Sequence, residues 1–376
     1  MNLSFTEEQE ILRKFARDFL ASKFPKKVVK EVEESEPGYS PEIWKEMAEL
    51  GWMGLPFPEK YGGTGMTFLD LAVLLEEMGK ACMPGPYFST VVLGGFPILD
   101  VGTEAQKQEH LPRIAQGKAI FTLALTEASG SYDAASIKVK AVPDGDGWVI
   151  SGTKLFVPDA HVADYILCVA RTDDKAKPEK GLTTFIVDTK QPGISHTVLK
   201  TMAGKLCEVV FKGAKVPKEN MLGKLNQGWS DINRVIDRAV LANCFHMLGM
   251  AQQVLGMTVD YAKERKQFDR PIGSFQIIQH YCADMLTDVE GMRLSAYQAA
   301  WKLSEGLPCA EEVAMARAWA VQAGERIMSL AHQIHGAIGV AIEYDLHYYT
   351  RYLKACELSF GGADFYREVV AQGMGL

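Results

Sequence analysis

One carboxylate stands out among the residues that could do chemistry. Asp237 lies in a long helical pattern, and the residues that share its helical row, at spacings of four, three and four, are uncharged: Leu241, Cys244 and Leu248. Because the row is otherwise uncharged, the Asp237 side chain is expected to face inward. An inward carboxylate is a candidate proton acceptor. The alternative is a structural role, in which Asp237 interacts with the helix dipole and pairs with Arg234 or Arg238.

A second polar and aromatic group lies further along the chain, where Arg265 and Phe268 precede Gln276. Asp237 and Arg265 are 28 residues apart, which corresponds to roughly 42 Å along a continuous helix. That distance exceeds the size of one small-molecule site. The sequence therefore predicts two sites, or a site shared between two subunits. The alternative for Arg265 is a solvated charge at a helix C-terminus.

The element that must position these residues is a long helix. No proline occurs from Trp229 to Lys266, and apolar residues recur there at helical spacing on more than one face. This pattern predicts a helix buried in a bundle. Ser230 and Asp231 are expected to cap its start.

Other helices are predicted before and after it. Thr6 and Gln9 have the spacing of a capping box, and Pro41 suits the first position of a helix. The glycine-rich stretch from Tyr61 to Gly65 lacks the spacing of a phosphate-binding loop, and a plain connection is the favoured interpretation. Breaks are expected near Gly273, at 306–308, at 335–339 and at 360–362.

Short β-rich runs separated by turn residues begin at about Ala119 and continue to about Leu225. Asp144-Gly145-Asp146-Gly147 between two runs predicts a hairpin. The predicted strands are 120–125, 137–141, 148–151, 165–170, 183–187 and 208–211. This change of pattern predicts a mainly α fold with a central β domain. The expected domains are an N-terminal helical domain over residues 1–119, a β domain over 120–226 and a C-terminal helical domain over 227–376.

Composition limits the function classes. A net charge of −7 over 376 residues argues against a general nucleic-acid binder. No apolar run reaches the length of a membrane span. Seven cysteines without a CxxC pair favour free thiols in a cytoplasmic protein, and the absence of HExxH leaves no expected metal site.

Five short strings, in this order, resemble the acyl-CoA dehydrogenase family. They are Tyr61–Gly65, Gly102–Gly117, Leu125-Thr126-Glu127 with Asp133, Arg265–Phe268 with Gln276, and Gln333–Gly336 with Gly339. The resemblance extends over essentially the full length. It implies the same three-domain order, with a β barrel or sandwich as the middle domain and a four-helix bundle as the C-terminal domain.

The resemblance implies FAD as cofactor and an acyl-CoA thioester as substrate, with a carboxylate taking the α proton and the flavin accepting the β hydride. It implies that Leu125, Thr126 and Phe156 contact the flavin ring. Residues expected to hold the adenosine-diphosphate half of FAD, across a subunit boundary, are Arg265, Phe268, Gln276, Gln333 and Gly336. An electron-transfer flavoprotein is the expected electron acceptor, and a dimer or tetramer is the expected assembly.

The chain departs from the family pattern at the base. Most members carry a glutamate before the last helix, where this chain has Phe360. A minority, acting on branched or long substrates, places the carboxylate early in the long helix before an arginine. Asp237 matches that position and is the expected base, with Arg238 beside it contacting substrate. Glu357 is a second, weaker candidate. Tyr132 replaces a small serine near the thioester and hints at the shape of the substrate pocket.

These departures resemble the small subunits of two-component enzymes that break down steroid side chains, alicyclic acids and dicarboxylic acids. The favoured hypothesis is an acyl-CoA dehydrogenase for a bulky, branched, cyclic or dicarboxylic acyl group. A second hypothesis is a half-site subunit that completes the site of a paralogous chain in a hetero-oligomer. A third keeps the fold but changes the chemistry to flavin monooxygenation or decarboxylation.

Overall fold

The computed structural model describes residues 4–376, which form two compact units. One unit comprises the described part of Met1–Lys30 together with Thr67–Met83 and Val240–Leu376. The other comprises Glu31–Met66 and Pro84–Ala239 and contains the β-sheet.

The sheet has eight strands in the order β6-β7-β3-β2-β4-β5-β8, and β1 pairs with β4. β1 runs parallel to β4, while β3 and β7 form a long antiparallel pair. The strands are β1 (Phe121–Ala124), β2 (Lys140–Asp144), β3 (Gly147–Pro158), β4 (Tyr165–Arg171), β5 (Leu182–Asp188), β6 (Ile194–Val198), β7 (Leu206–Pro217) and β8 (Met221–Leu222). Alternate apolar side chains of β3, β4, β5 and β7 form the buried core of this sheet.

The sequence predicted most of these strands. The hairpin is confirmed, because Asp144 pairs with Gly147 at its closed end. β3 and β7 each extend over 12 residues, beyond the short runs expected for them. β6 and β8 were not predicted: β6 is largely exposed and lacks apolar alternation, and β8 has only 2 residues.

Helices accompany the sheet within the same unit: α3 (Pro41–Glu49), α5 (Phe96–Val101) and α6 (Glu104–Ala115), with a π-helix at Phe88–Gly95. α6 packs against β1 and β4. The His110 ring lies 5.4 Å from the Phe121 ring, and Arg113 Nη1 donates to Tyr165 Oη at 2.8 Å. α2 (Lys26–Glu34) runs from one unit into the other.

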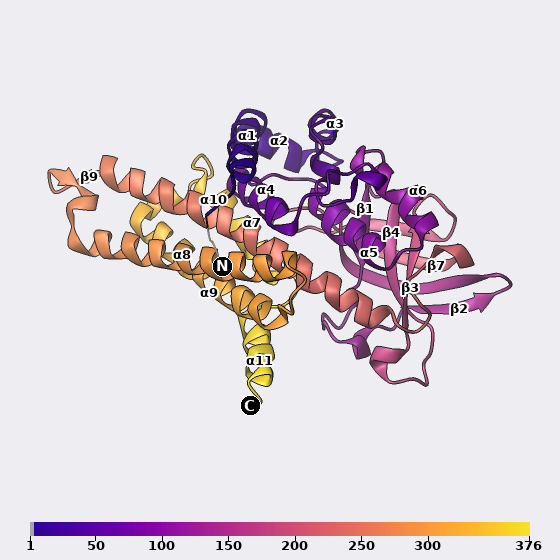
Figure 1. Ribbon diagram of the computed structural model, residues 1–376. Helices are drawn as coiled ribbons and strands as arrows, with labels where there is room; N and C mark the ends of the chain where they lie inside the picture. Colours follow the sequence, from indigo (N-terminus) through magenta and orange to yellow (C-terminus); the bar gives the residue numbers. More distant parts are fainter. Residues whose placement is uncertain (1–3) are drawn as a thin grey trace. The chain divides into compact units, whose positions relative to one another are not determined.

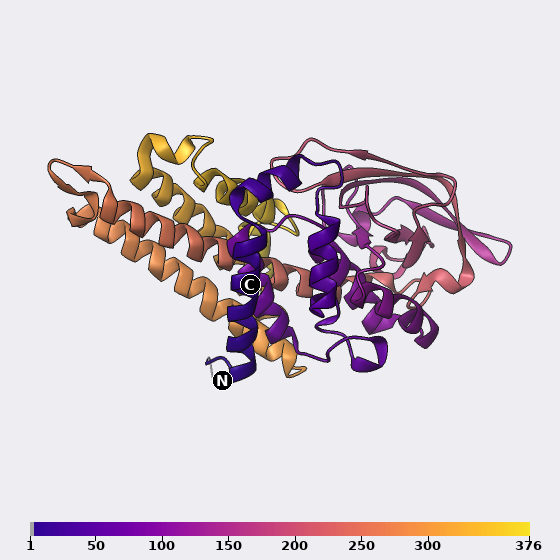
Figure 2. The ribbon, with the colours of Figure 1, turned by 90° about the horizontal axis from the view of Figure 1, so that it is seen from above.

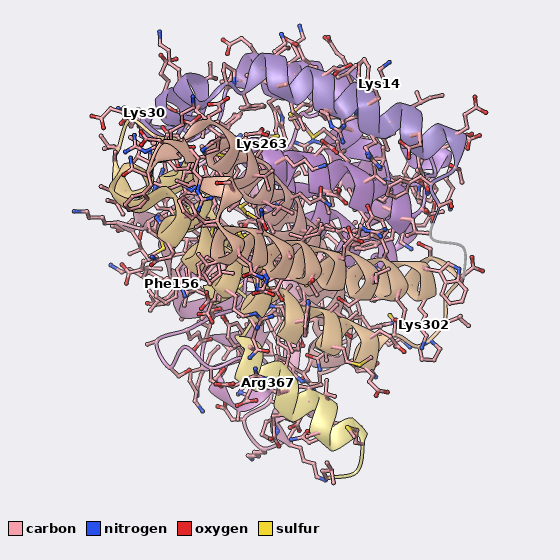
Figure 3. The ribbon with its side chains drawn as sticks, turned by 90° about the vertical axis from the view of Figure 1, so that its left-hand side faces the viewer. Lys14, Lys30, Phe156, Lys263, Lys302 and Arg367 are labelled. Atoms are coloured by element: carbon pink, nitrogen blue, oxygen red, sulfur yellow. The ribbon has the colours of Figure 1, made fainter. Side chains whose placement is uncertain are left out.

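The unit without the eight-stranded sheet is mainly helical. α7 and α8 run side by side toward the hairpin that joins them (Figures 1 and 2). Its elements are α1 (Glu7–Lys23), α4 (Phe68–Ala81), α7 (Gly228–Glu264) from Val240 onward, β9 (Lys266–Gln267), β10 (Arg270–Pro271), α8 (Gln276–Ser304), α9 (Ala310–His335), α10 (Leu346–Leu358) and α11 (Ala363–Gly373). Lys302 of α8, labelled in Figure 3, pairs with Glu312 of α9.

Close helix crossing explains two glycines in this unit. A Cβ on Gly249 of α7 would lie 1.9 Å from the Glu76 carbonyl oxygen of α4. A Cβ on Gly79 would lie 2.2 Å from the His246 carbonyl oxygen. Only glycine therefore allows these two backbones to approach so closely.

The predicted helix signals were confirmed in part. Thr6 and Gln9 form the capping box of α1, Ser40 caps α3 ahead of Pro41, and the helices break at the expected positions. The predicted cap of α7 was wrong. α7 starts at Gly228, so Ser230 and Asp231 already lie in its first turn, and the Ser230 hydroxyl donates to the Gln227 carbonyl oxygen.

Candidate active site

Asp237 lies in the third turn of α7, on the row that continues through the fully buried Leu241, Cys244 and Leu248. The Asp237 side chain is half-buried. Within Glu31–Met66 and Pro84–Ala239, no side chain forms a hydrogen bond or ion pair with its carboxylate. Burial raises the pKa of Asp237 to about 6, because an unpaired carboxylate loses hydration without gaining a compensating charge.

The ion pairs around Asp237 contradict one part of its structural alternative, namely pairing with Arg234 or Arg238. Arg234 pairs with Asp231, with Nη2 2.6 Å from Oδ1. Arg238 pairs with Asp100 of α5. Asp237 is therefore a partly desolvated carboxylate without a counter-ion in its own unit, a state suited to accepting a proton. The expected contact of Arg238 with substrate stays a prediction.

Leu125, Thr126 and Phe156 lie together at one end of the sheet. Leu125 and Thr126 directly follow β1, and the Leu155 backbone N–H donates to the Thr126 carbonyl oxygen at 2.9 Å. Leu125 is buried and Thr126 is half-buried. Phe156 (labelled in Figure 3) is 51% exposed and has φ +55°, an unusual conformation for a bulky residue. The structure thus brings together the three residues expected to contact the flavin ring.

A buried ion pair supports this end of the sheet and was not recognised from the sequence. Lys154 of β3 is 0% exposed, and its Nζ lies 2.7 Å from Glu127 Oε1 and 2.9 Å from the Leu125 carbonyl oxygen. Glu127 also accepts hydrogen bonds from the backbone N–H groups of Lys138 and Val139. Burial lowers the pKa of Lys154, and Glu127 opposes that shift. The pair therefore connects three segments: β3, the residues that follow β1, and the residues that precede β2.

Tyr132 is half-buried in the loop between β1 and β2. Its neighbours stabilise the loop through a hydrogen bond from the Ser131 hydroxyl to Asp133 Oδ2 at 2.9 Å. A short 3-10 helix, Ala134–Ser136, follows at once. Tyr132 therefore lies in the same unit as Asp237, and its role toward substrate stays a prediction.

The residues expected to hold the adenosine-diphosphate half of FAD gather at one end of the helical unit. Arg265 directly follows α7, Phe268 lies at the turn between β9 and β10, and Gln276 begins α8. Gln333 and Gly336 lie at the C-terminal end of α9.

A ring contact joins these two groups. Tyr261 of α7 stacks on His335 with ring centroids 4.5 Å apart, and the Tyr261 hydroxyl donates to the His335 carbonyl oxygen. His335 in turn contacts the Tyr344 hydroxyl at 3.0 Å through Nε2. This aromatic cluster was missed from the sequence, because its members come from three separate segments.

The surface at this end is polar, aromatic and open. Phe268 is 87% exposed at φ +54°, and Arg265, Gln276 and Gln333 are exposed. Gly336 has φ +62° and ψ −139°, a conformation essentially restricted to glycine, and no atom lies within 4 Å of where its Cβ would be. A cation, two amides, an aromatic ring and open backbone are the groups that bind a diphosphate and an adenine.

The turn that would carry the usual family base is built around Arg317. Arg317 of α9 is 0% exposed and donates to the carbonyl oxygens of Cys356, Ser359 and Gly361. Phe360 lies in this turn at φ +60°. No carboxylate among residues 4–376 pairs with Arg317, so main-chain carbonyls and the Asn243 side-chain oxygen, 2.8 Å from Nη1, satisfy this buried cation.

Glu357, the weaker candidate base, is engaged elsewhere. Its Oε2 lies 2.6 Å from Lys354 Nζ, one helical turn away on α10. Glu357 is therefore engaged in an ion pair, whereas Asp237 has no ion pair within its own unit. The choice of Asp237 as base stays a prediction.

Family models cover nearly the whole chain in the expected order. The acyl-CoA dehydrogenase N-terminal domain matches residues 6–118, the middle domain matches 122–214, and the C-terminal domain matches 226–375. This chain belongs to the acyl-CoA dehydrogenase family. The resemblance, the fold class and the assignment as an oxidoreductase of this family are confirmed.

Individual relatives extend this finding. The chain is 34% identical to a probable acyl-CoA dehydrogenase, YngJ, of Bacillus subtilis, over 99% of both chains. It is 33% identical to the caffeyl-CoA reductase-Etf complex subunit CarC of Acetobacterium woodii, over 98% of both chains. A solved chain of the ChsE4-ChsE5 complex from Mycobacterium tuberculosis matches with a TM-score of 0.91 and 29% identity, over 100% of this chain and 99% of that one.

Acyl-CoA dehydrogenases are FAD-dependent flavoproteins, and the residues present in this chain fit that cofactor. Exposed donors and an aromatic ring at the α7–α8 turn suit its adenosine-diphosphate half. The end of the sheet at Leu125, Thr126 and Phe156, where the Phe156 side chain is 51% exposed, suits its ring. No helix between residues 4 and 376 has the length and apolar character needed to cross a membrane. The described chain also has no cluster of three His, Cys, Asp or Glu side chains that could hold a metal ion.

Proposed function

We propose that this chain dehydrogenates an acyl-CoA thioester between its α and β carbons, with Asp237 accepting the α proton. The observation that carries the proposal is the half-buried Asp237 carboxylate without a counter-ion in its unit. Phe360, at the position of the usual family glutamate, has no group that can accept a proton.

The protein residues have defined tasks in this proposal. With a pKa of about 6, Asp237 is ionised at pH 7 and is more basic than an exposed aspartate. Leu125, Thr126 and Phe156 contact the flavin ring and keep water from that face. The α7–α8 turn and the end of α9 bind the adenosine-diphosphate half. Bound FAD supplies the acceptor for the β hydride.

The substrate and partners form the finer part of the proposal. A base on α7 rather than at position 360 matches the family minority that acts on branched or long substrates, so a bulky, branched, cyclic or dicarboxylic acyl group is proposed. Arg238 and Tyr132 are proposed to contact this substrate. An electron-transfer flavoprotein is the proposed acceptor, supported by the similarity to CarC of a reductase-Etf complex. The proposed setting is a cytoplasmic dimer or tetramer.

Anaerobic mixing with a panel of acyl-CoA thioesters tests the proposal. Asp237→Asn should keep FAD bound but slow flavin bleaching by about 10²–10⁴-fold, the usual contribution of a positioned base. Glu357→Gln is the matched control and should bleach at a rate close to that of the wild type. Bleaching of Asp237→Asn at the wild-type rate would show that another group accepts the proton.

A second candidate is a half-site subunit that completes the active site of a related chain. Two observations favour it: the missing carboxylate at Phe360 and the similarity to a chain of a two-chain complex. The visible spectrum of the chain purified alone separates the two candidates. A yellow protein that bleaches with an acyl-CoA supports the complete enzyme. A colourless protein that gains flavin only with a second, related chain supports the subunit.

A further inference from the structure

Asp237 is flanked on α7 by two arginines, and each arginine is engaged by a different aspartate. Arg234 precedes Asp237 by three residues, a spacing at which two helical side chains can pair. Its guanidinium instead turns back to Asp231, with Nη2 2.6 Å from Oδ1. In Asp231–Arg234 the acid precedes the base, the orientation that the helix dipole favours.

The backbone opposite Asp231 makes room for this carboxylate. Gly223 has φ +75°, and a Cβ there would lie 2.8 Å from Asp231 Oδ2. The Asp231 side chain is only 16% exposed, whereas that of Arg234 is 62% exposed. The aspartate is thus the more buried member of the pair and the arginine the more exposed one.

Arg238 is held from a different element. Its Nη1 donates to Asp100 Oδ2 on α5, and its guanidinium carbon lies 4.9 Å from the centre of the Phe96 ring. The side chains of Arg238 and Asp100 are 24% and 18% exposed. An ion pair and a cation–π contact therefore fix this guanidinium on α5.

We propose that Asp100 and Asp231 are positioning residues, which hold the two arginines flanking Asp237 on other partners and so leave the Asp237 carboxylate without a counter-ion. Burial is the one cause of the raised pKa of Asp237, and within residues 4–376 no charged group contributes to it. The nearest charged residues along α7 are Arg234 and Arg238, and their partners are Asp231 on α7 and Asp100 on α5.

The arrangement matters because a counter-ion would weaken the base. An arginine within about 4–6 Å lowers the pKa of a carboxylate by about 1–3 units. Asp237 would then approach the basicity of an exposed aspartate. The catalytic meaning of this inference rests on the proposed function, whereas the ion-pair arrangement can be tested without turnover.

The test is the pKa of Asp237, measured by carbon NMR titration of the full FAD-loaded chain labelled with ¹³C at aspartate carboxyls, with Asp237→Asn used to assign the signal. In Asp100→Asn and in Asp231→Asn the released arginine should lower this pKa, by less than the about 1–3 units that a close cation produces. Arg238 is adjacent to Asp237 in the helix and does not face it, and water screens the exposed Arg234. Asp144→Asn, which breaks the exposed pair with Lys215, is the matched control and should leave the Asp237 pKa unchanged.

A second experiment removes the charge of Arg238. Asp100→Asn combined with Arg238→Met should return the Asp237 pKa to about its wild-type value, because the cation responsible is gone. A pKa that stays near 6 in the double variant Asp100→Asn/Asp231→Asn overturns the inference. Undiminished bleaching by Asp237→Asn overturns only the base assignment, so the two failures are distinguishable.

Discussion

Replacing Asp237 by asparagine should stabilise the protein at neutral and alkaline pH. Burial raises the pKa of Asp237 from an ordinary value of 3.8 to about 6, a difference of about two units. Each unit corresponds to about 1.4 kcal/mol. An ionised Asp237 therefore costs the folded state up to about 3 kcal/mol, and about 1–3 kcal/mol once the screening of a half-buried group is considered.

The sign of the pH dependence follows from proton binding. Between pH 4 and 6 the folded state keeps a proton on Asp237 that the unfolded state releases, so the free energy of unfolding falls as pH rises through this window. Asp237→Asn removes this decrease in the free energy of unfolding. The free energy of unfolding of the variant should exceed that of the wild type by almost nothing at pH 4 and by about 1–3 kcal/mol at pH 7 to 8.

Denaturant unfolding at constant ionic strength, repeated at unit steps from pH 4 to pH 8, measures the gain. Because the chain has two compact units, the transition should be followed by hydrogen exchange of peptides that contain the start of α7, which separates their unfolding. Asp144→Asn is the control and should show no pH-dependent gain. A gain that is equal at every pH, or a wild type that is the more stable protein at pH 8, would refute a desolvated, unpaired Asp237.

Two further predictions concern the cofactor residues. Lys154→Met should destabilise the protein by about 3–5 kcal/mol, because it leaves the buried Glu127 carboxylate unpaired. It should also reduce the amount of FAD that the protein retains after gel filtration. A free energy of unfolding within about 1 kcal/mol of the wild-type value would contradict this prediction. Phe268→Ala should change the unfolding midpoint little, since the ring is 87% exposed, but should weaken FAD binding measured by flavin fluorescence titration. Ile277→Ala, also exposed on α8, is its control, and equal FAD affinity in Phe268→Ala and wild type would refute the assignment.

The local structure of the chain was largely predictable from its sequence. The capping box at Thr6, the proline start at Pro41 and the hairpin at 144–147 depend on neighbouring residues, so short-range rules describe them. The long uninterrupted course of α7, apart from its first residues, was also predictable, because the apolar pattern continues without proline. The order of family strings predicted the fold and family that the comparisons show.

Several local predictions failed where neighbours alone do not decide the structure. Ser230 and Asp231 carry good capping side chains, yet α7 begins earlier, at Gly228. Gly228 packs against β5, where a Cβ would lie 3.0 Å from the Leu182 carbonyl oxygen. β6 was missed because its exposed residues show no apolar alternation, and pairing with β7 alone defines it.

Only the tertiary structure decided the partners of the charged groups. The sequence places Arg234 and Arg238 beside Asp237 and offers both as its counter-ions. Folding assigns one to Asp231 and brings Asp100, 137 residues before Asp237, to the other. Lys154 and Glu127 likewise become a buried pair only when β3 meets the end of β1. Charge pairing and desolvation depend on distances between segments remote in the chain. The sequence by itself therefore determined which residue types are available, and the fold determined which carboxylate stays unpaired.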